Sequence, residues 1–421
     1  MILLYNRDTD LSRGKFIFIF MALEKETAVE RTGINVAKKG FNGADVKQRN
    51  RGLVLRQVAS SRQVSRASLT KSIGLTKMAV SNIVSELMDQ HYLPETELAV
   101  TQGAGRTPVL LDIAEDAPLI AGIYLSRDAL SGIVTDLKLN VLFEQTQPLQ
   151  NETAESLEEK LSVLTDALLS FQPNRLLGIG GSAIGLLDRR QGVLLNPRNF
   201  FGIQNFPIVR LLREQSGLPV LLHTDMKAAA LAERLYGDYR RHNFIYLGIT
   251  NGVGSGIISD GKLFHDGNDA AGEIGHLSVD PNGPICSCGR RGCLELYAGM
   301  PVVLKRLEEA CGVTDLTPKD LEKLSEDWRA NAILEEVVEK IATALIDLIN
   351  LLDADAVLIG HEGSYLPKKY LEMLKDEVNL GIFSAGYKQV EIRLASFGER
   401  APLLGSACCV LDALFAGELE E

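Results

Sequence analysis

Three of the chain's six cysteines lie within eight residues, in the segment 286–293, which reads Cys-Ser-Cys-Gly-Arg-Arg-Gly-Cys. His276 lies ten residues before the first of them. Zinc prefers four nitrogen or sulfur ligands in a tetrahedron, and three cysteines with one histidine are typical of a closed structural site. The two glycines allow the segment to fold back on itself. The spacing therefore predicts one structural zinc ion per chain, bound by His276, Cys286, Cys288 and Cys293.

Carboxylates flank this cluster, with Glu273 shortly before the histidine and Glu295 shortly after the last cysteine. Their position favours a zinc ion that shapes a ligand-binding site over a zinc ion that only stabilises the loop. A thiolate-rich metal site also indicates a reducing compartment, so we expect a cytoplasmic protein. The alternative is that the clustered cysteines are only buried free thiols, which behave as small apolar side chains. That interpretation fits the three remaining cysteines, Cys311, Cys408 and Cys409.

The chain has 421 residues, of which 46% are hydrophobic, enough for large cores in two or three domains. Its net charge of −11 argues against nucleic-acid binding when it is averaged over the chain. However, residues 46–92 hold eight Lys or Arg and two acidic residues, which gives +6 there and leaves −17 elsewhere. A basic segment on an acidic body is typical of a DNA-binding head carried by a regulatory domain.

Residues 1–45 are predicted to form a flexible tail. Their apolar run, Phe16–Leu23, is too short to cross a bilayer. Arg13 and Lys15 before this run weakly resemble the start of a signal peptide, but no small-residue cleavage site follows. Met21 is an alternative first residue, which would make residues 1–20 an upstream extension. We therefore expect no membrane partner.

The basic segment has the pattern of three helices. Apolar residues at 53, 54, 55 and 58 mark the first. Ser65 is predicted to cap a second helix, which buries Ala67, Leu69 and Ile73, and Thr76 to cap a third helix after Gly74. A helix that follows a short glycine-containing turn is typical of the recognition helix of a helix-turn-helix motif.

The third helix has an apolar face and a polar face with small donors and acceptors and one cation, which suits base edges and phosphates. An ordinary solvated helix face is the alternative. After it, strands at 95–100 and 107–112 are predicted to form a hairpin that could act as a wing. Arg106 in its turn would contact a phosphate or a minor groove, or would instead brace the domain junction. The expected DNA-binding domain spans 46–115, with contacts from Ser65, Arg66, Thr76, Lys77, Ser81, Asn82, Ser85 and Arg106.

From residue 116 onward, strands and helices alternate, which predicts an α/β body. Glycine-rich turns are expected at 180–185 and 250–256, where two strands end. Two lobes, about 116–240 and 241–421, would then face a ligand-binding cleft. We expect strands at 120–124, 132–136, 176–179, 220–222, 244–247 and 356–359, and helices at 155–171, 226–235 and 333–352.

Several motifs resemble the ROK family, whose name stands for repressors, open reading frames and sugar kinases. In the body they are Gly252–Gly256, Gly272-Glu273-Ile274-Gly275-His276 and the cysteine segment with Glu295. The head resembles the winged helix-turn-helix of the family's repressor branch. Its matching motifs are Ser65-Arg66-Ala67-x-Leu69, Gly74-Leu75-Thr76-x-x-x-Val80-Ser81 and Gly105-Arg106-x-Pro108.

The resemblance implies a two-lobed, actin-like (ribonuclease H-like) sugar-kinase fold that closes on a sugar. Carboxylates can accept hydrogen bonds from sugar hydroxyls, and an imidazole can do so while its other nitrogen binds zinc. In the family's kinases, the aspartate that matches Asp225 of this chain is the base that activates the sugar hydroxyl. Helix capping is the alternative role for Asp225 and Glu273. The family's sugar-binding residues match Asn199, Asp225, Glu273, His276 and Glu295.

The kinases of the family bind ATP phosphates with an Asp-x-Gly-Gly-Thr-Lys loop, which matches residues 124–129 here. Tyr124 replaces the aspartate, both glycines are absent, and Asp128 would repel phosphate. Gly252 and Gly254 of the second phosphate loop are present, although a turn alone also requires them. The later Gly-Gly of the nucleotide site reads Gly360-His361. We therefore expect no enzymatic activity, because a base at position 225 would have no phosphoryl donor.

Together, these features predict a sugar-responsive transcriptional regulator, a repressor of genes for carbohydrate uptake or catabolism. It would bind a palindromic operator in double-stranded DNA as a homodimer or homotetramer. Sugar binding in the zinc-braced cleft would change its operator affinity. The alternative is an ATP-dependent sugar kinase with an appended DNA-binding head. A third interpretation makes the body a sensor for a protein partner.

Overall fold

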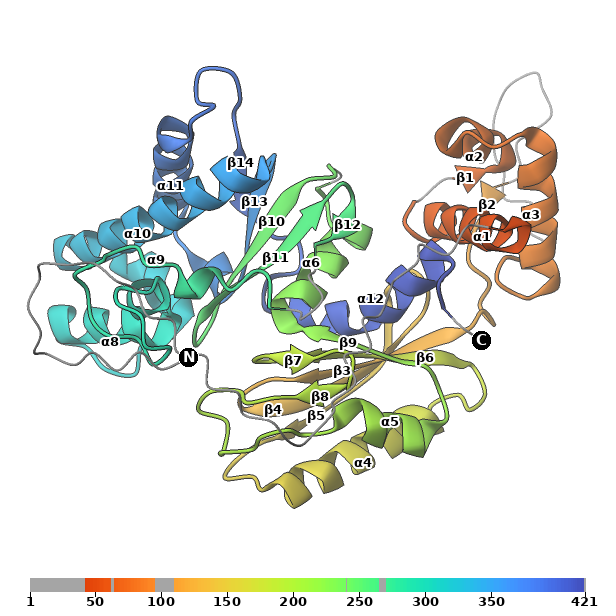
Figure 1. The fold of residues 1–421 in the computed structure, drawn as a ribbon, viewed down its shortest axis with the longest axis horizontal. Helices are drawn as coiled ribbons and strands as arrows, with labels where there is room; N and C mark the ends of the chain where they lie inside the picture. Colours follow the sequence, from red (N-terminus) through yellow and green to blue (C-terminus); the bar gives the residue numbers. More distant parts are fainter. Residues whose placement is uncertain (1–41, 62–63, 95–109, 240, 265–269, 420–421) are drawn as a thin grey trace, which may run out of the picture. The chain divides into compact units, whose positions relative to one another are not determined.

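The fold is described from a computed structural model, which covers residues 42–61, 64–94, 110–239, 241–264 and 270–419 (Figure 1). The described residues from Gly43 onward form one compact unit. The predicted N-terminal tail up to residue 41 lies outside the described residues. So does most of the predicted hairpin, including Arg106.

Three helices and a small sheet form the N-terminal part of the described chain, which we call the head. The predicted caps are present, since Ser65 Oγ accepts a hydrogen bond from the N–H of Ser68 and Thr76 Oγ1 from that of Ala79. Gly74 ends the second helix with a φ of 70°, which glycine adopts without steric cost. The elements are α1 (Gly43–Ala59), α2 (Arg66–Ile73), α3 (Lys77–Asp89) and the antiparallel pair β1 (Val64–Ser65) and β2 (Leu110–Leu111).

The head has its own buried side chains, among them Val54 of α1, Leu69 of α2 and Val84 of α3. Two predicted core positions are wrong, because Leu53 is 41% exposed and Ala67 is also exposed. Successive residues of a helix point about 100° apart, so Leu53 cannot share one narrow face with both residues that follow it. The apolar run in the sequence did not distinguish which of its members would face the core.

The first sheet of the body has the order β5-β4-β3-β6-β9, in which β3, β4 and β5 are antiparallel and β6 and β9 run parallel to β3. Leucines spaced three or four residues apart on α4 pack onto this sheet. The elements are β3 (Leu119–Leu125), β4 (Ala129–Thr135), β5 (Val141–Pro148), α4 (Ala154–Ser170), β6 (Leu176–Ala183), the short pair β7 (Leu187–Asp188) and β8 (Val193–Leu194), α5 (Ile208–Ser216) and β9 (Val220–Thr224).

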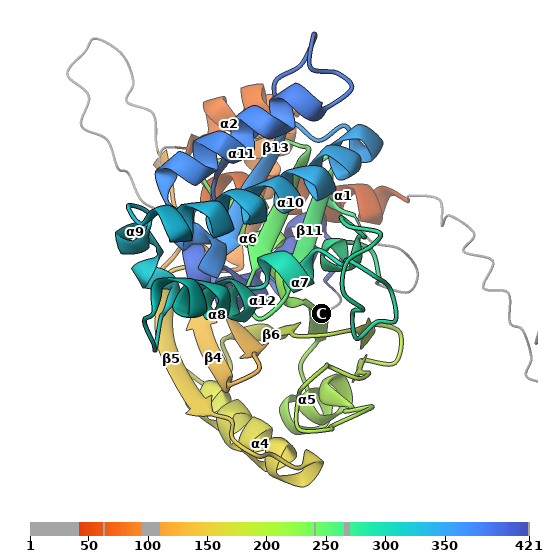
Figure 2. The same ribbon diagram turned by 90° about the vertical axis from the view of Figure 1, so that its left-hand side faces the viewer.

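The second sheet repeats this arrangement with the order β12-β11-β10-β13-β14. Again three antiparallel strands are followed by two parallel ones. Helices α10 and α11 lie side by side, and their buried residues share one hydrophobic core with residues of this sheet (Figure 2). The elements are β10 (Phe244–Ile249), β11 (Val253–Ser259), β12 (Lys262–Leu263), α7 (Glu295–Ala298), α8 (Met300–Cys311), α9 (Leu321–Leu324), α10 (Trp328–Leu352), β13 (Ala356–His361), α11 (Lys368–Gly381) and β14 (Glu391–Leu394).

Two helices connect the sheets: α6 (Asp225–Tyr236) packs on the second sheet, α12 (Ala401–Ala416) on the first, and they pack on each other. Residues 401–411 of α12 are all buried, as expected of a helix that is apolar on every side.

The predicted glycine turn at 180–185 is wrong in its first half, because β6 continues to Ala183. A side chain at Gly180 would overlap the carbonyl oxygen of Ser406, so glycine here allows α12 to approach the sheet.

The predicted turn at 250–256 is also shorter than expected, because β11 already begins at Val253. Only residues 250–252 link it to β10. Two of the motif's glycines lie in the strand, where Gly256 faces α6 so closely that a side chain would overlap the carbonyl oxygen of Met226. Both corrections have one cause: a helix that is distant in sequence packs on the glycines.

Helix α12 also contacts the head. Its residue Phe415 lies so close to α1 that a side chain at Gly52 would overlap the Phe415 carbonyl oxygen. The head therefore packs through backbone contact on the same helix that packs on α6. Within the described residues, no helix combines the length and apolar character needed to cross a bilayer.

Candidate functional site

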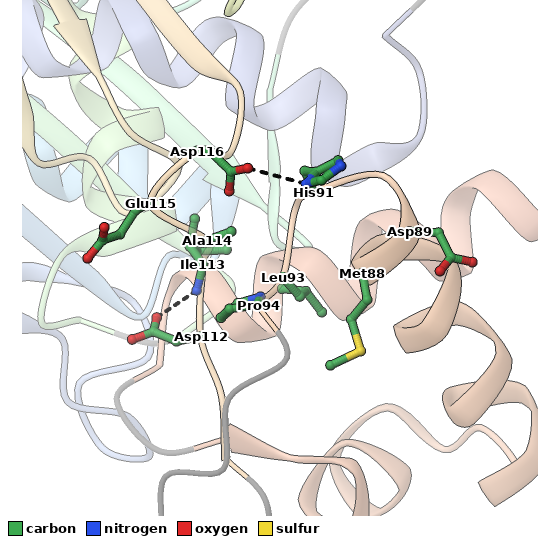
Figure 3. A pocket seen from close by; sticks show the side chains of 10 residues that line it. All are labelled: Met88, Asp89, His91, Leu93, Pro94, Asp112, Ile113, Ala114, Glu115 and Asp116. Atoms are coloured by element: carbon green, nitrogen blue, oxygen red, sulfur yellow. Dashed lines mark hydrogen bonds and ion pairs between the residues drawn. The ribbon is translucent and has the colours of Figure 1, made fainter.

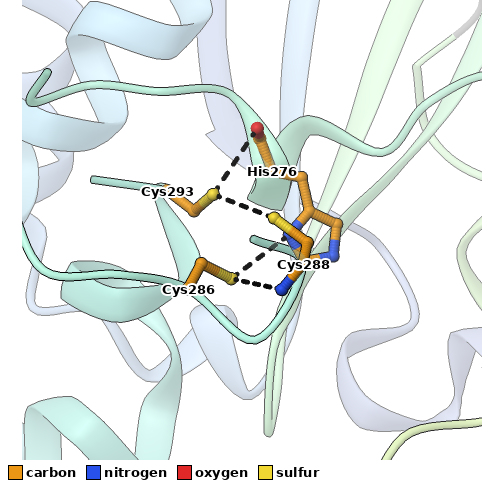
Figure 4. A group of neighbouring side chains, drawn as sticks. All are labelled: His276, Cys286, Cys288 and Cys293. Carbon is orange, nitrogen blue, oxygen red and sulfur yellow. Dashed lines mark hydrogen bonds between the residues drawn. The ribbon is translucent and has the colours of Figure 1, made fainter. Parts of the chain in front are cut away.

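The four predicted zinc ligands lie together at one point (Figure 4). The ligand atoms of His276, Cys286, Cys288 and Cys293 are all within 4.8 Å of one another. The Sγ atoms of Cys288 and Cys293 are 3.5 Å apart, and Cys286 Sγ is 3.7 Å from His276 Nδ1. Tetrahedral zinc with bonds of about 2.3 Å to sulfur places neighbouring sulfurs roughly 3.7 Å apart. The donor set and its spacing therefore fit one zinc ion.

Backbone interactions shape the loop that carries the cysteines. The N–H of Cys286 donates to the carbonyl of Arg290 at 2.7 Å, and Ser278 forms an isolated antiparallel bridge to Cys293. Gly292 has a φ of 60°, and a side chain there would overlap the carbonyl oxygen of Asp280. The glycine that the sequence motif contains at this position is thus required both by the backbone conformation and by space.

The thiols differ in their acidity. Burial raises the pKa of Cys293 to about 12, whereas a backbone hydrogen bond from Arg290 lowers the pKa of Cys288. A metal ligand must be the thiolate, so a bound cation would have to stabilise the charged form of Cys293 at neutral pH. All cysteines of the chain are free of disulfides.

Glu295, the first residue of α7, lies beside the metal-ligand cluster. Its Oε1 accepts a hydrogen bond from the Cys286 thiol at 3.3 Å and is 3.6 Å from His276 Nδ1. The loop that carries the cysteines therefore also sets the position of this carboxylate. His276 lies at the end of a short 3-10 turn, Ile274–His276, directly after Glu273.

Asp225 is the first residue of α6, and its Oδ1 accepts a hydrogen bond from the N–H of Met226 at 2.8 Å. The N-cap residue of α6 is Thr224, and its side chain makes no capping bond. Asp225 lies close enough to Glu273 for the two charges to interact. Desolvation raises the pKa of its carboxyl to about 7, and the negative charge of Glu273 adds to this effect. Burial likewise raises the pKa of Glu273, against the opposing effect of His276 and the buried Lys227.

Asn199 lies in the loop before α5, with a left-handed φ of 52°. Arg127 holds this loop, because its guanidinium donates to the carbonyl of Asn199 at 2.9 Å and also to that of Arg198. The Arg198 guanidinium in turn donates to Ser287 Oγ and lies 4.0 Å from Glu295. Two arginines thus connect the segment 124–129, the Asn199 loop and the cysteine loop. Sequence reasoning missed both roles, since it considered the segment 124–129 only for its departure from the phosphate-binding motif.

Several acidic side chains lie near the segment 124–129. Burial raises the pKa of Glu362 to about 7, and the nearby Glu399 and Asp128 raise it further. Tyr124 lies close enough to Asp225 and Asp128 that they contribute to the raised pKa of its hydroxyl, after burial. Each of these groups disfavours the ionisation of its neighbours, because like charges repel.

The predicted DNA-contacting residues of the head divide into two groups. Ser65 and Thr76 act as helix caps, and Arg66 donates to Ser81 Oγ at 3.1 Å, which joins α2 to α3. The second group is exposed on α3 and consists of Lys77, Asn82 and Ser85. Arg106 lies outside the described residues.

A separate pocket lies where α3 meets the segment after β2 (Figure 3). His91 Nδ1 lies 3.2 Å from Asp116 Oδ2 at its edge. None of the predicted sugar-binding or metal-binding residues lines it. The lining residues are Met88, Asp89, His91, Leu93, Pro94, Asp112, Ile113, Ala114, Glu115 and Asp116.

Residues 120–413 match the model of a protein family described as the ROK family. The chain belongs to the ROK family. The predicted resemblance is confirmed by this match, which covers both sheets and the metal-ligand cluster.

Individual relatives span more of the chain. The "Xylose repressor" of Bacillus subtilis (strain 168) is 30% identical over 377 residues, which cover 87% of this chain and 96% of the relative. The "N-acetylmannosamine kinase" of Pasteurella multocida (strain Pm70) is 31% identical over 296 residues, 68% of this chain and 94% of the kinase. A solved ROK family transcriptional regulator, described as a homologue of the E. coli MLC protein, superimposes with a TM-score of 0.76 at 23% identity. That match covers 89% of this chain and 98% of the regulator. The predicted α/β body of the ROK sugar-kinase type is thus confirmed.

Proposed function

We propose that this protein is a sugar-responsive, DNA-binding transcriptional repressor that does not phosphorylate its sugar. One observation supports the proposal: Asp225 and Glu273 lie close enough for their charges to interact, while the segment 124–129 holds Tyr124 and Arg127 near acidic side chains. Such a site would bind a sugar without ATP. The repressor names of relatives that also span the head support the same conclusion.

In this proposal the head is a winged helix-turn-helix domain at residues 46–115, and the sugar-binding domain spans 116–421. Helix α3 would lie in the major groove, because Lys77, Asn82 and Ser85 are exposed along it. Arg66 would position α3 through Ser81 and offer its remaining donors to phosphate. The wing with Arg106 would add backbone or minor-groove contacts.

One structural zinc ion per chain would be held by His276, Cys286, Cys288 and Cys293. Bound zinc would supply the charge that keeps the thiols ionised and would fix the loop. Glu295 follows Cys293 by only two residues, so a loop fixed by zinc would also fix the position of this carboxylate. The sugar hydroxyls would be bound by Asn199, Asp225, Glu273, His276 and Glu295.

The repressor would bind a palindromic operator as a homodimer or a larger homo-oligomer, with one head on each half-site. Sugar bound at the start of α6 would favour a different arrangement of α6 and α12. Because α12 contacts α1 of the head, this change would reach the DNA-binding surface and lower operator affinity.

A sugar kinase with an appended head is the second candidate. Asp225 stands where the family's kinases have their base, and N-acetylmannosamine kinases are among the relatives. The acidic surrounding of Glu362 and the loss of the phosphate loop oppose this candidate, since Asp225 would have no bound phosphoryl donor.

The test uses the purified full chain and operator DNA selected from a random library. Operator affinity is measured with xylose, glucose, N-acetylmannosamine and their phosphates, with and without ATP. We expect one sugar to lower operator affinity without ATP, and no ADP to form. Asp225→Asn should lose this response and keep operator binding, while the exposed control Glu158→Gln should behave as the wild type. Sugar-dependent ADP release that Asp225→Asn abolishes would establish the kinase instead.

A further inference from the structure

Met78 is a large apolar side chain on the polar side of α3. It is 76% exposed, more than any other large apolar side chain in the described part of the head. Leu87, nine residues later, is fully buried in the core of the head. Nine residues correspond to about two and a half turns of an α-helix, so the two side chains point in opposite directions. The core of the head therefore leaves Met78 in the solvent.

Met78 shares its side of α3 with residues that face DNA in the proposed function. Asn82 and Ser85 follow it by four and seven residues, a spacing that places all three on one face of the helix. Both are exposed, as is Lys77. Lys77 and Met78 are the first two residues of α3. In a helix-turn-helix motif the N-terminal residues of the recognition helix contact base edges, so Met78 holds one of the positions nearest to the bases.

The charges at this end of α3 suit a negatively charged partner. The first turn contains Lys77 and no acidic residue, and the N-terminus of a helix adds a partial positive charge. Glu86, the first acidic residue of α3, pairs with Lys47 of α1 at 2.7 Å. Arg66 of α2 donates to Ser81 Oγ at 3.1 Å, which adds a cation beside the helix. This charge pattern favours DNA over the apolar surface of a protein partner.

The chemistry of methionine narrows what Met78 can recognise in DNA. The major groove presents hydrogen-bond donors and acceptors, and thymine adds a methyl group to them. A thioether donates no hydrogen bond and accepts only a weak one. Its flexible and polarisable chain instead packs well against apolar groups. Of the groups in the major groove, the thymine methyl is therefore the one that suits this side chain.

We propose that Met78 is a specificity-determining residue, which contacts the C5-methyl group of a thymine in the operator half-site. Asparagine can recognise adenine through two hydrogen bonds, so Asn82 and Met78 would together select A·T base pairs. Four residues of helix rise by about 6 Å, which corresponds to roughly two base pairs at about 3.4 Å each. The thymine should thus lie within about two base pairs of the adenine bound by Asn82. This inference rests on the proposed function and deepens it, because it names a base that the head selects.

Deoxyuridine lacks only the methyl group of thymidine, so replacing one by the other isolates this contact. An operator is first selected from a random DNA library with the full-length wild-type protein. Each thymine of one half-site is then replaced in turn by deoxyuridine, and fluorescence anisotropy measures the Kd of every duplex at one salt concentration. For the wild type, one replacement near the predicted place should raise the Kd about fourfold, as expected for the burial of one methyl group.

Three variants of the full chain assign this effect to a side chain. Met78→Ala should bind the thymine and uracil duplexes equally at that position, and bind the unmodified operator about fourfold or more weakly than the wild type does. Met78→Leu retains an apolar side chain and should retain the preference for thymine. Leu53→Ala is the matched control, because Leu53 is an exposed apolar residue on α1 of the same head, and it should behave as the wild type. Circular dichroism checks that each variant is folded.

Two results would overturn the inference. In the first, no uracil replacement weakens the binding of the wild type, although the operator is bound specifically. In the second, folded Met78→Ala keeps the wild-type preference for thymine, which would mean that another side chain contacts the methyl group. Failure of the proposed function is distinguishable from both, because the wild type would then select no sequence from the library, and the role of Met78 would fall with it.

Discussion

Replacing Arg127 by alanine should weaken sugar binding and leave operator binding without sugar unchanged. Its guanidinium donates to the carbonyls of Arg198 and Asn199, so the substitution releases the loop that presents Asn199. A hydrogen bond from a charged group contributes about 1.5–3 kcal/mol. Because these bonds are exposed to solvent, we expect the lower end of this range or less, on the order of a tenfold rise in the sugar Kd. Arg127→Lys should recover part of this loss.

The pH dependence gives a second readout for the same variant. Burial already raises the pKa of Asp225 to about 7, the N–H of Met226 lowers it, Glu273 raises it, and Arg127 lowers it. A carboxylate that accepts sugar hydroxyls acts in its charged form, so affinity should be full above this pKa and lost as the pH falls through it. Removing the cation at 127 should raise the pKa and shift the midpoint of sugar binding to higher pH. Calorimetric titration between pH 5.5 and 8.5 measures both effects. An unchanged Kd and midpoint in Arg127→Ala would refute the reasoning.

Three further predictions address the other parts of the protein. Cys288→Ala should lose the bound zinc and the response to sugar, while the head stays folded. Metal analysis measures the first effect, and operator binding with and without sugar measures the other two. Metal-free wild-type protein, purified without chelator, would contradict it. Asn82→Ala should reduce operator preference by about 1–3 kcal/mol, whereas Lys77→Ala should weaken all DNA sequences similarly and lower the salt dependence. If both variants distinguish the operator from other DNA as well as the wild type does, recognition lies outside α3. Gly52→Val should separate α1 from Phe415 of α12, so that sugar still binds but changes operator affinity less than in the wild type. An undiminished sugar effect on the operator would exclude this route.

The metal-ligand cluster could be predicted in full from the sequence. Its four ligands lie within eighteen residues of chain, and their spacing and glycines already define one short loop. The caps at Ser65 and Thr76 were predictable for the same reason, since a cap bonds an N–H three residues away. The strands and helices expected in the body coincide with β3, β4, β6, β9, β10, β13, α4, α6 and α10, whereas β5, β11, β14, α11 and α12 were not expected. The features that were predicted share a local origin, because neighbours along the chain determine them.

The glycine motifs show where local reasoning failed. Gly180 and Gly256 were predicted in turns, but both lie in strands, where α12 and α6 pack against them. A glycine in the sequence indicates missing side-chain volume and backbone freedom alike, and only the tertiary structure shows which of the two is used. Leu53 is a similar case, because hydrophobicity does not reveal which side of a helix faces the core.

The sequence by itself indicated the family and the grouping of His276, Cys286, Cys288 and Cys293, since both depend on residue types at short spacing. Tertiary structure decided what the segment 124–129 contacts. Arg127 contacts the carbonyl of Asn199 across 72 positions of sequence, and Arg198 contacts Ser287 across 89. It also decided that Asp225 and Glu273 are close enough for each charge to affect the other. Such pairs have no signal in one sequence, because their proximity results from how the two sheets and α6 pack, and packing depends on the whole chain.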